Sequence, residues 1–359
     1  MVAKAWGVEK GGRSVTPATR GANAPAVEEL FFTNQAVSLC LLVHRRAKTM
    51  RVVDFRAGAT SAKRLFVLSF AHREGVEKVY TLVERDEVST WTKLGFTKEG
   101  AVPGFYKRSD AYLLGCTVTG EPRNIPLESE TRIAIAPLGG RDSFLPAAIE
   151  EEEAEEAEVD TTGHDFAEKT LVMAKKRAKE LAEDASRPAR PLSASVKRGQ
   201  PAKSAIPTAK LSVLKEADVK KPVAAALKSG RALTAFEPFG RDVVRSYFSI
   251  TARGGFELIA SSESQECFGN AYLELLTAPK TEVERLGTAA ALGALCERLI
   301  CQNIVSCFGL VPSDDVALAT AYVFNGFRRT GLLRNHMVVG GVRKDAIVFS
   351  RKLANPADD

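Results

Sequence analysis

The chain has 359 residues, of which 45% are hydrophobic, so it can form two domains of ordinary size with substantial cores. The net charge of +6 is modest, and no apolar run approaches the length of a membrane span, which excludes a helical membrane protein. Six cysteines occur without a CxxC pair and without clustering with the four histidines, so we predict reduced thiols and no metal site. No signal peptide is recognisable, and we expect a cytoplasmic protein.

Apolar periodicity predicts the elements of a first unit, at 26–145. The Gly-, Lys- and Arg-rich residues 1–25 that precede it show no such period and predict a disordered arm. We expect helices at 61–74 and 86–96, and strands at 27–33, 36–44, 50–58, 78–84, 101–107 and 110–118.

The composition changes between 146 and 233. Glu150–Asp160 is almost entirely acidic, a charged helix is possible at 165–185, and Arg187–Arg231 carries eleven Lys or Arg residues among several prolines. Clustered lysines can bind phosphate, but no aromatic residue is interleaved to stack on bases, which disfavours nucleic acid as a partner. We predict a charged Pro/Ala/Lys-rich linker, with a protein partner as one possible ligand.

A second unit, at 234–359, repeats the order of the first. We expect a hairpin at 243–262 that turns at Arg253-Gly254-Gly255, helices at 281–302 and 314–325, and strands at 270–278, 304–311, 331–339 and 345–353. Gly95-Phe96 and Gly326-Phe327 end helices 231 positions apart, and Gly100 and Gly331 keep that offset. The fold class is therefore α/β (α+β), with two mixed-sheet units in tandem duplication. Two unrelated segments that share a common helix end are the alternative.

This order of elements resembles the later part of the GNAT acyltransferase fold, a family that uses acetyl-coenzyme A. In the second unit, "PKTEVERLGTAAAL" places Glu284, Gly287 and Ala289 on the three positions of the family's pyrophosphate-binding loop. Glu284 departs from the usual Gln or Arg. The resemblance implies that backbone amides at the helix start bind the cofactor, and the candidate residues are Arg285, Leu286, Gly287, Thr288 and Ala289. Alternatively, Gly287 and the alanines simply allow close packing of a helix on a sheet.

Two further residues of the second unit are candidates for catalysis. Tyr322 stands four residues before Gly326, where the resemblance implies a general acid that protonates the coenzyme A thiolate. Glu274 lies on the predicted central strand, where alternation could direct it into the cleft as the base for an amine acceptor. The tail "TGLLRNHMVVGGVRKDAIVFSRKL" weakly resembles the β-lysine N-acetyltransferase branch.

The first unit lacks this chemistry. Its signature positions hold Ala57, Thr60 and Ala62, with Gly58 displaced, and Trp91 replaces the tyrosine. An indole N–H is not a useful acid. One hypothesis is therefore that the second unit transfers an acetyl group to a small-molecule or protein amine while the first unit is structural. The other is that both units are non-catalytic binding modules, since neither shows the strand and two helices that begin a complete GNAT domain.

Overall fold

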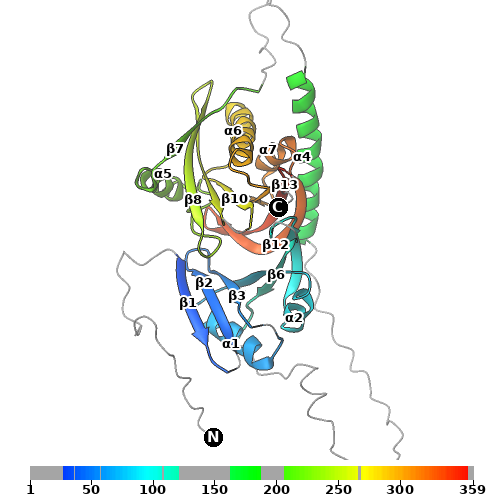
Figure 1. Cartoon of the computed structure of the whole chain (residues 1–359). Helices are drawn as coiled ribbons and strands as arrows, with labels where there is room; N and C mark the ends of the chain where they lie inside the picture. Colours follow the sequence, from blue (N-terminus) through cyan, green and yellow to red (C-terminus); the bar gives the residue numbers. More distant parts are fainter. Residues whose placement is uncertain are drawn as a thin grey trace, which may run out of the picture.

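The computed structural model describes residues 27–35, 37–56, 58–106, 109–120, 162–186, 206–265 and 268–354. The arm predicted at 1–25 and the acidic run at 150–160 lie outside these residues. All described strands belong to one mixed sheet of thirteen strands (Figure 1).

The first unit forms six strands and two helices close to the predicted positions. They are β1 (Val27–Thr33), β2 (Ser38–His44), β3 (Thr49–Asp54), α1 (Ser61–Arg73), β4 (Lys78–Val83), α2 (Val88–Lys93), β5 (Thr97–Val102) and β6 (Ala111–Thr117). β5 begins and ends earlier than the strand predicted at 101–107, because its first residue, Thr97, directly follows the Gly95-Phe96 helix end. The chain then turns at Gly104, whose φ of 65° favours glycine.

The second unit forms seven strands and three helices. They are β7 (Lys210–Leu214), α5 (Glu216–Lys228), β8 (Val244–Ala252), β9 (Phe256–Ser264), β10 (Asn270–Leu275), α6 (Glu282–Ile300), β11 (Ser306–Pro312), α7 (Val316–Phe324), β12 (Arg328–Val339) and β13 (Val342–Lys352). The turn at Gly254 and Gly255 has φ of 87° and 77°, as the hairpin prediction required.

Three ordered elements lie in the interval predicted as a linker. β7 pairs with β8 along its full length, and α5 packs Val219 and Ala226 into a hydrophobic cluster with Leu276. The sheet of the second unit therefore starts well before residue 234. Pro222 lies inside α5 and does not break it; a proline removes one backbone hydrogen bond, and burial of the apolar face offsets that loss.

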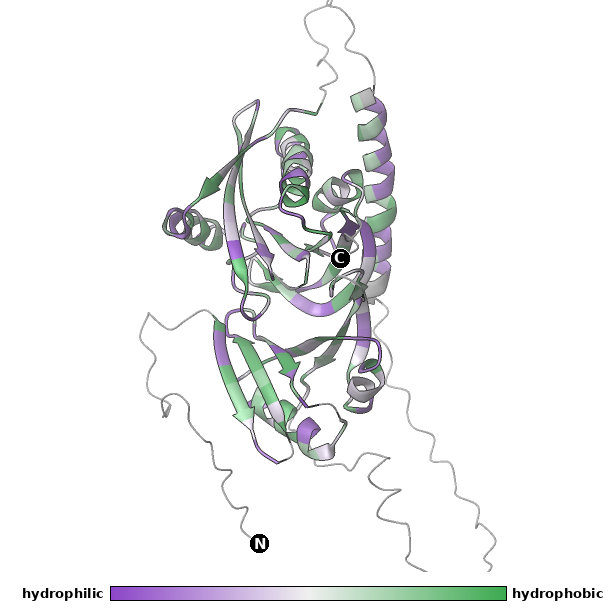
Figure 2. Cartoon of the chain, viewed as in Figure 1, coloured by the Kyte–Doolittle hydropathy of each residue, from purple (hydrophilic) through white to green (hydrophobic). Residues whose placement is uncertain are grey.

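The third element, α4 (Thr162–Ser186), covers α7. Its buried residues Ala167, Leu171, Ala174 and Ala178 recur at helical spacing, and small side chains on such a stripe let two helices approach closely. Glu168 also pairs with Arg329 of β12 at 2.6 Å. The α4 ribbon accordingly carries hydrophobic and hydrophilic residues along its whole length (Figure 2).

The two units have the same strand order. The sheet runs β1-β2-β3-β4-β6-β5 in the first unit and β8-β9-β10-β11-β13-β12 in the second, with β7 added at the outer edge. The units join where β5 pairs antiparallel with β12 at Gly100 and Gly331. A Cβ atom added to Gly100 would lie 2.8 Å from the Cα of Gly331, so the strands cross at a point where only glycine fits.

The two Gly-Phe helix ends have one geometry. Gly95 and Gly326 have φ of 87° and 78°, the left-handed conformation that commonly ends a helix. The amide of Phe96 donates to the carbonyl of Trp91 and that of Phe327 to Tyr322, both at 3.1 Å. Trp91 and Tyr322 therefore occupy equivalent places.

The sheet brings together the faces of the two units that lie opposite α1 and α2 in the first unit and opposite α6 and α7 in the second. Helices α1 and α2 pack on the outer face of the first unit, whereas α6, α7 and α4 pack on that of the second. Between them lies a shared core that includes Tyr80 and Leu82 of β4 and Tyr272, Phe308 and Leu310 of the second unit. Residues from both units can therefore line one cavity.

Candidate active site

The parallel strands β10 and β11 separate at their carboxyl ends. Their pairing runs from Asn270↔Ser306 to Leu273↔Gly309 and stops there, although both strands continue. A cavity of about 130 Å³ opens beyond that point, lined by residues of both strands and of α7. Ligands of mixed sheets commonly bind at the carboxyl ends of diverging parallel strands, so this opening is the first candidate site.

Tyr322 of α7 lines this cavity from the helix side. Its ring stacks on Phe349 and meets Phe327 edge-on, with centroids 5.5 and 4.9 Å apart. A Cβ added to Gly309 would lie 3.0 Å or less from three Tyr322 atoms, including the hydroxyl oxygen. Glycine in β11 therefore lets the hydroxyl reach the point where the strands separate. Burial, with Cys307, Cys296 and Glu274 nearby, raises the pKa of Tyr322, so the hydroxyl keeps its proton at neutral pH.

Glu274 of β10 lines the cavity from the other side of the sheet. It accepts hydrogen bonds from Thr234, from Arg245 at 2.5 Å and from Ser261 at 3.1 Å. Burial raises the pKa of this carboxyl above 4.5, while the Arg245 guanidinium opposes the rise. Both oxygens of Glu274 are thus occupied, and the Arg245 guanidinium balances the charge of the carboxylate.

The loop between α5 and β8, residues 229–243, forms one wall of the cavity. Glu263 accepts hydrogen bonds from the amides of Phe239 and Gly240, at 2.9 and 2.6 Å, and pairs with Arg245. Arg245 also donates to the carbonyl of Glu237 at 2.5 Å. This ionic network holds the loop so that Thr234 and Glu237 face the cavity.

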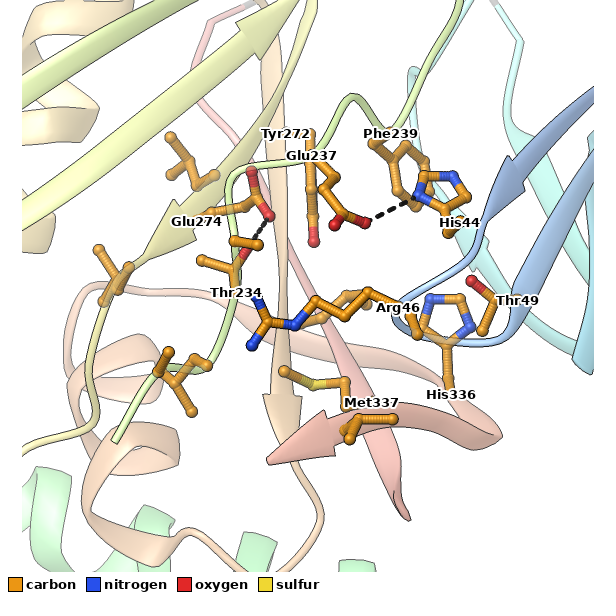
Figure 3. Close-up of a pocket in the computed structure, with 18 of the residues that line it drawn as sticks. His44, Arg46, Thr49, Thr234, Glu237, Phe239, Tyr272, Glu274, His336 and Met337 are labelled. Atoms are coloured by element: carbon orange, nitrogen blue, oxygen red, sulfur yellow. Dashed lines mark hydrogen bonds and ion pairs between the residues drawn. The ribbon is translucent and has the colours of Figure 1, made fainter. Parts of the chain in front are cut away.

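The first unit supplies the opposite wall. His44, Arg46 and Thr49, from the β2–β3 hairpin, line the cavity together with His336 of β12. Figure 3 shows Glu237 directed at His44 and Arg46 extending across the cavity toward Thr234. The Nδ1 atom of His44 lies 3.5 Å from a carboxylate oxygen of Glu237. Sequence reasoning missed these residues, since nothing local in the chain links His44 to a loop almost 200 positions away.

The start of α6 is capped by its own side chains. Thr281 accepts from the amide of Glu284 at 3.2 Å, and the Glu284 carboxylate accepts from the amides of Lys280 and Thr281, at 2.6 and 3.3 Å. These amide hydrogen bonds, Lys280 first, lower the pKa of Glu284, and Arg231 approaches it at 3.4 Å. Thr281-x-x-Glu284 is a capping box, a readable sequence signal that accounts for the departure from the family's loop.

The predicted cofactor-binding residues divide into one exposed side chain and four buried positions. Arg285 is exposed and pairs with Glu282 at 3.2 Å, whereas Leu286, Gly287, Thr288 and Ala289 are buried. A Cβ on Gly287 would lie 2.8 Å or less from three carbons of the Phe256 ring. The glycine is therefore needed for packing of α6 on β9, as the alternative interpretation held.

A second cavity, of about 280 Å³, lies beside this helix start. Arg285 and Ala289 line it together with Thr320 of α7 and with Arg177 and Asp184 of α4. The first amides of α6, those of Glu282 and Val283, have no acceptor within the helix, and the helix dipole favours an anion there. Arg285 and Arg177 line this cavity, but the carboxylates of Glu180, Asp184 and Glu282 line it too, so its acidic side chains outnumber its basic ones.

The first unit closes the equivalent positions. Pairing of β3 with β4 also ends after four residue pairs, at Val52↔Thr81, but Thr81 stands where the second unit has Gly309 and donates to the carbonyl of Val52 at 2.9 Å. The ammonium of Lys63 donates to the carbonyls of Arg56 and Gly58, at 2.7 and 2.8 Å, at the start of α1. A loop that presents carbonyls to an internal cation does not suit phosphate.

The chain is similar to solved N-acetyltransferases over part of its length. The ribosomal-protein-S18-alanine N-acetyltransferase from Escherichia coli is 21% identical, with a TM-score of 0.32, and the similarity covers 42% of this chain and 98% of that enzyme. The spermidine N-acetyltransferase from Vibrio cholerae in complex with CoA and spermine is 12% identical, with a TM-score of 0.34. The similarity covers 42% of this chain and 99% of that enzyme. No protein-family model and no curated protein sequence matches the chain.

None of the helices that the structure describes is long and apolar enough to cross a membrane. In the described ranges, no three His, Cys, Asp or Glu side chains group as metal ligands would.

Proposed function

We propose that the protein is an acyl-coenzyme A-dependent N-acyltransferase that moves an acetyl group from acetyl-coenzyme A to an amine. The observation that carries the proposal is the opening between β10 and β11, which has Tyr322 on its helix side and acidic residues on its opposite side. A thioester that enters between the strands meets a proton donor at its sulfur, while an amine approaches from the other unit.

The pyrophosphate of the cofactor would lie at the start of α6. The amides of Glu282 and Val283, with Arg285 and Arg177, are the groups proposed to hold it, beside the predicted segment Arg285–Ala289. Glu180, Asp184 and Glu282 also line this cavity, and Glu282 pairs with Arg285, so the proposal rests mainly on the backbone amides as donors to the pyrophosphate. The cofactor supplies the activated acyl group, and the chain supplies binding, orientation and proton transfer.

Tyr322 is the proposed general acid. The departing thiolate takes a proton from the hydroxyl, whose raised pKa keeps it protonated until the C–S bond breaks. Glu274 is the proposed acidic group that faces the acceptor. Because its oxygens are occupied by Arg245, Ser261 and Thr234, its proposed role does not include removing a proton from the acceptor.

The shared strand order supports an origin by tandem duplication, in which the second unit kept the chemistry and the first became the wall of the acceptor site. The resemblance of the tail to the β-lysine N-acetyltransferase branch agrees with a small amine as acceptor, and a protein amine is the other candidate.

The second candidate function is a non-catalytic module that acts by binding a partner. The capping of α6 by Glu284 favours it, because an internal carboxylate already occupies the place of an anion. The two candidates differ in one measurable property, the affinity for acetyl-coenzyme A.

Calorimetric titration with acetyl-coenzyme A tests the proposal. We expect binding by the wild type and by Tyr322→Phe, and at least tenfold weaker binding by Arg285→Glu. Thiol release in the presence of an amine should fall about 10²-fold in Tyr322→Phe, the usual effect of one positioned proton donor. Trp91→Phe, at the equivalent place in the first unit, is the matched control and should leave the rate unchanged. No binding by the wild type would favour the non-catalytic module.

A further inference from the structure

We propose that the first unit supplies the base for the reaction: His44, oriented by Glu237, removes a proton from the ammonium group of a small primary amine bound against the β2–β3 hairpin. This inference rests on the proposed function and names the acceptor class and a catalytic residue of that same cavity.

The geometry of His44 suits a base. Its Nδ1 atom faces the Glu237 carboxylate at 3.5 Å, which favours the tautomer with the proton on Nδ1 and leaves a lone pair on Nε2. The side chain is 8% exposed, and Nε2 has no hydrogen-bond partner among the described residues. A buried imidazole nitrogen without a partner costs free energy unless a ligand or water satisfies it.

A second imidazole in the same wall also has a buried ring nitrogen without a hydrogen-bond partner among the described residues. His336 of β12 lines the cavity, is 8% exposed as a residue, and its Nδ1 finds no partner within the described part of the chain. Burial, together with the nearby Lys78, His44 and Arg343, lowers the pKa of His336 to about 3, so this ring is neutral. It can accept or donate one hydrogen bond without adding charge. Two unpaired nitrogens in one cavity point to a polar ligand.

The charges and rings around the cavity indicate a cation. Glu237 and Glu274 both line it, and the rings of Tyr272 and Phe239, 4.6 Å apart, present aromatic surface to the same space. Carboxylates and ring faces together recognise an ammonium group. Arg46 also extends across this space toward Thr234 (Figure 3), so its guanidinium would meet an uncharged or anionic part of the acceptor and not the ammonium group.

The volume limits the acceptor to a small group. About 130 Å³ is well below the roughly 300 Å³ at which typical ligand pockets begin. An amino group on a short alkyl stem fits, whereas a bulky amine must leave most of its body outside.

Both walls are fixed before any ligand arrives. Arg343 of β13 donates to the carbonyl of Ala47 at 2.6 Å and so holds the β2–β3 hairpin against the second unit. Arg51 of β3 donates to the carbonyl of Phe239 at 2.7 Å and so holds the loop that carries Glu237. Each unit thus anchors the part of the other that faces the cavity, and the His44–Glu237 pair is oriented in advance.

The proton balance is complete with these groups. His44 takes one proton from the ammonium group and becomes an imidazolium that Glu237 stabilises. The free amine then forms the N–C bond, the C–S bond breaks, and the thiolate takes the Tyr322 proton. The nitrogen loses its second proton to restore Tyr322, and His44 releases its proton to solvent.

Two amines of similar size separate this role from a structural one. Ethylamine is fully protonated at pH 7.5, whereas 2,2-difluoroethylamine is largely neutral because fluorine withdraws electrons. With acetyl-coenzyme A, His44→Gln should lower kcat/KM at least 10²-fold for ethylamine but less than tenfold for 2,2-difluoroethylamine. Glu237→Gln should show the same pattern with a smaller loss. His72→Gln, an exposed histidine of α1, is the matched control.

Nuclear magnetic resonance of ¹⁵N-histidine-labelled protein provides a readout that does not need turnover. Ethylamine should shift the Nε2 resonance of His44 in the wild type, and Glu237→Gln should change the His44 tautomer. Equal rates for His44→Gln and wild type, an equal loss with both amines, or no shift of Nε2 on addition of ethylamine would each overturn the inference. Failure of the wild type to bind acetyl-coenzyme A would instead refute the proposed function, and the Nε2 shift would still report whether an amine binds here.

Discussion

Arg245 is the residue whose loss should disturb the second unit most. Its guanidinium, 9% exposed, lies between the carboxylates of Glu263 and Glu274, which are 3% and 7% exposed, and it also donates to the Glu237 carbonyl. In Arg245→Met the apolar stem is kept and the positive charge is lost. Two buried carboxylates then face each other without compensation.

The expected cost follows from breaking a buried ion pair, about 3–5 kcal/mol in the free energy of unfolding. The pH dependence has a definite sign. Burial already raises the pKa of Glu274 above 4.5, and loss of the guanidinium raises it further. The folded state then binds more protons than the unfolded state above pH 4.5, so stability falls as the pH rises through that window and returns as the pH is lowered.

Urea unfolding at pH 8 and pH 5 measures both effects. We expect Arg245→Met to lose about 3–5 kcal/mol at pH 8 and clearly less at pH 5. Adding Glu274→Gln should recover about 1–3 kcal/mol at pH 8, the coupling expected for direct contacts, and should reduce the pH dependence. Arg245→Lys keeps a charge and serves as the milder variant. If the free energy of unfolding of Arg245→Met lies within about 1 kcal/mol of the wild-type value at pH 8, the ionic network does not stabilise the loop.

Three further substitutions test the packing. Gly287→Ala should lower the free energy of unfolding by about 1–3 kcal/mol, because the new Cβ atom meets the Phe256 ring. Adding Phe256→Leu should restore part of that loss. Urea unfolding measures both effects, and full stability of Gly287→Ala would contradict the close packing. Lys63→Met should lower the free energy of unfolding by about 3–5 kcal/mol, since it leaves the Asp54 carboxylate buried without the ammonium group that lies 2.6 Å away. Adding Asp54→Asn should recover part of that stability. No recovery in the double variant would mean that water solvates the carboxylate. Gly331→Ala should lower the melting temperature through a backbone clash at the junction, so an unchanged value in calorimetry would refute the close crossing.

The local elements could be predicted from the sequence because their signals are local. The Gly-Phe helix ends have the expected left-handed glycines, and the hairpin at Gly254 and Gly255 turns where predicted. The interval at 206–233 was misjudged because it continues a Lys- and Pro-containing stretch, whereas its order depends on pairing of β7 with β8. Pairing partners far along the chain leave no mark in a local window.

The residues of the candidate site also differ in whether the sequence around them carries a signal. Tyr322 follows a family position and Glu274 follows strand alternation, and both line the cavity between β10 and β11, while their catalytic roles stay predictions. His44 has no such signal, since its place in the cavity depends on how the first unit packs on the second. Thr281 and Glu284 carried a readable capping box that was interpreted only as a departure from the phosphate loop.

The crossing of β5 and β12 has a consequence for any attempt to separate the units. Each unit would expose, when expressed alone, the long edge that its partner now covers, and an unpaired edge strand readily adds another strand. Because Gly100 and Gly331 hold equivalent places in a junction of near-twofold character, the edge of one unit closely resembles the edge it normally meets. We therefore expect an isolated second unit to pair with a second copy of itself through Gly331.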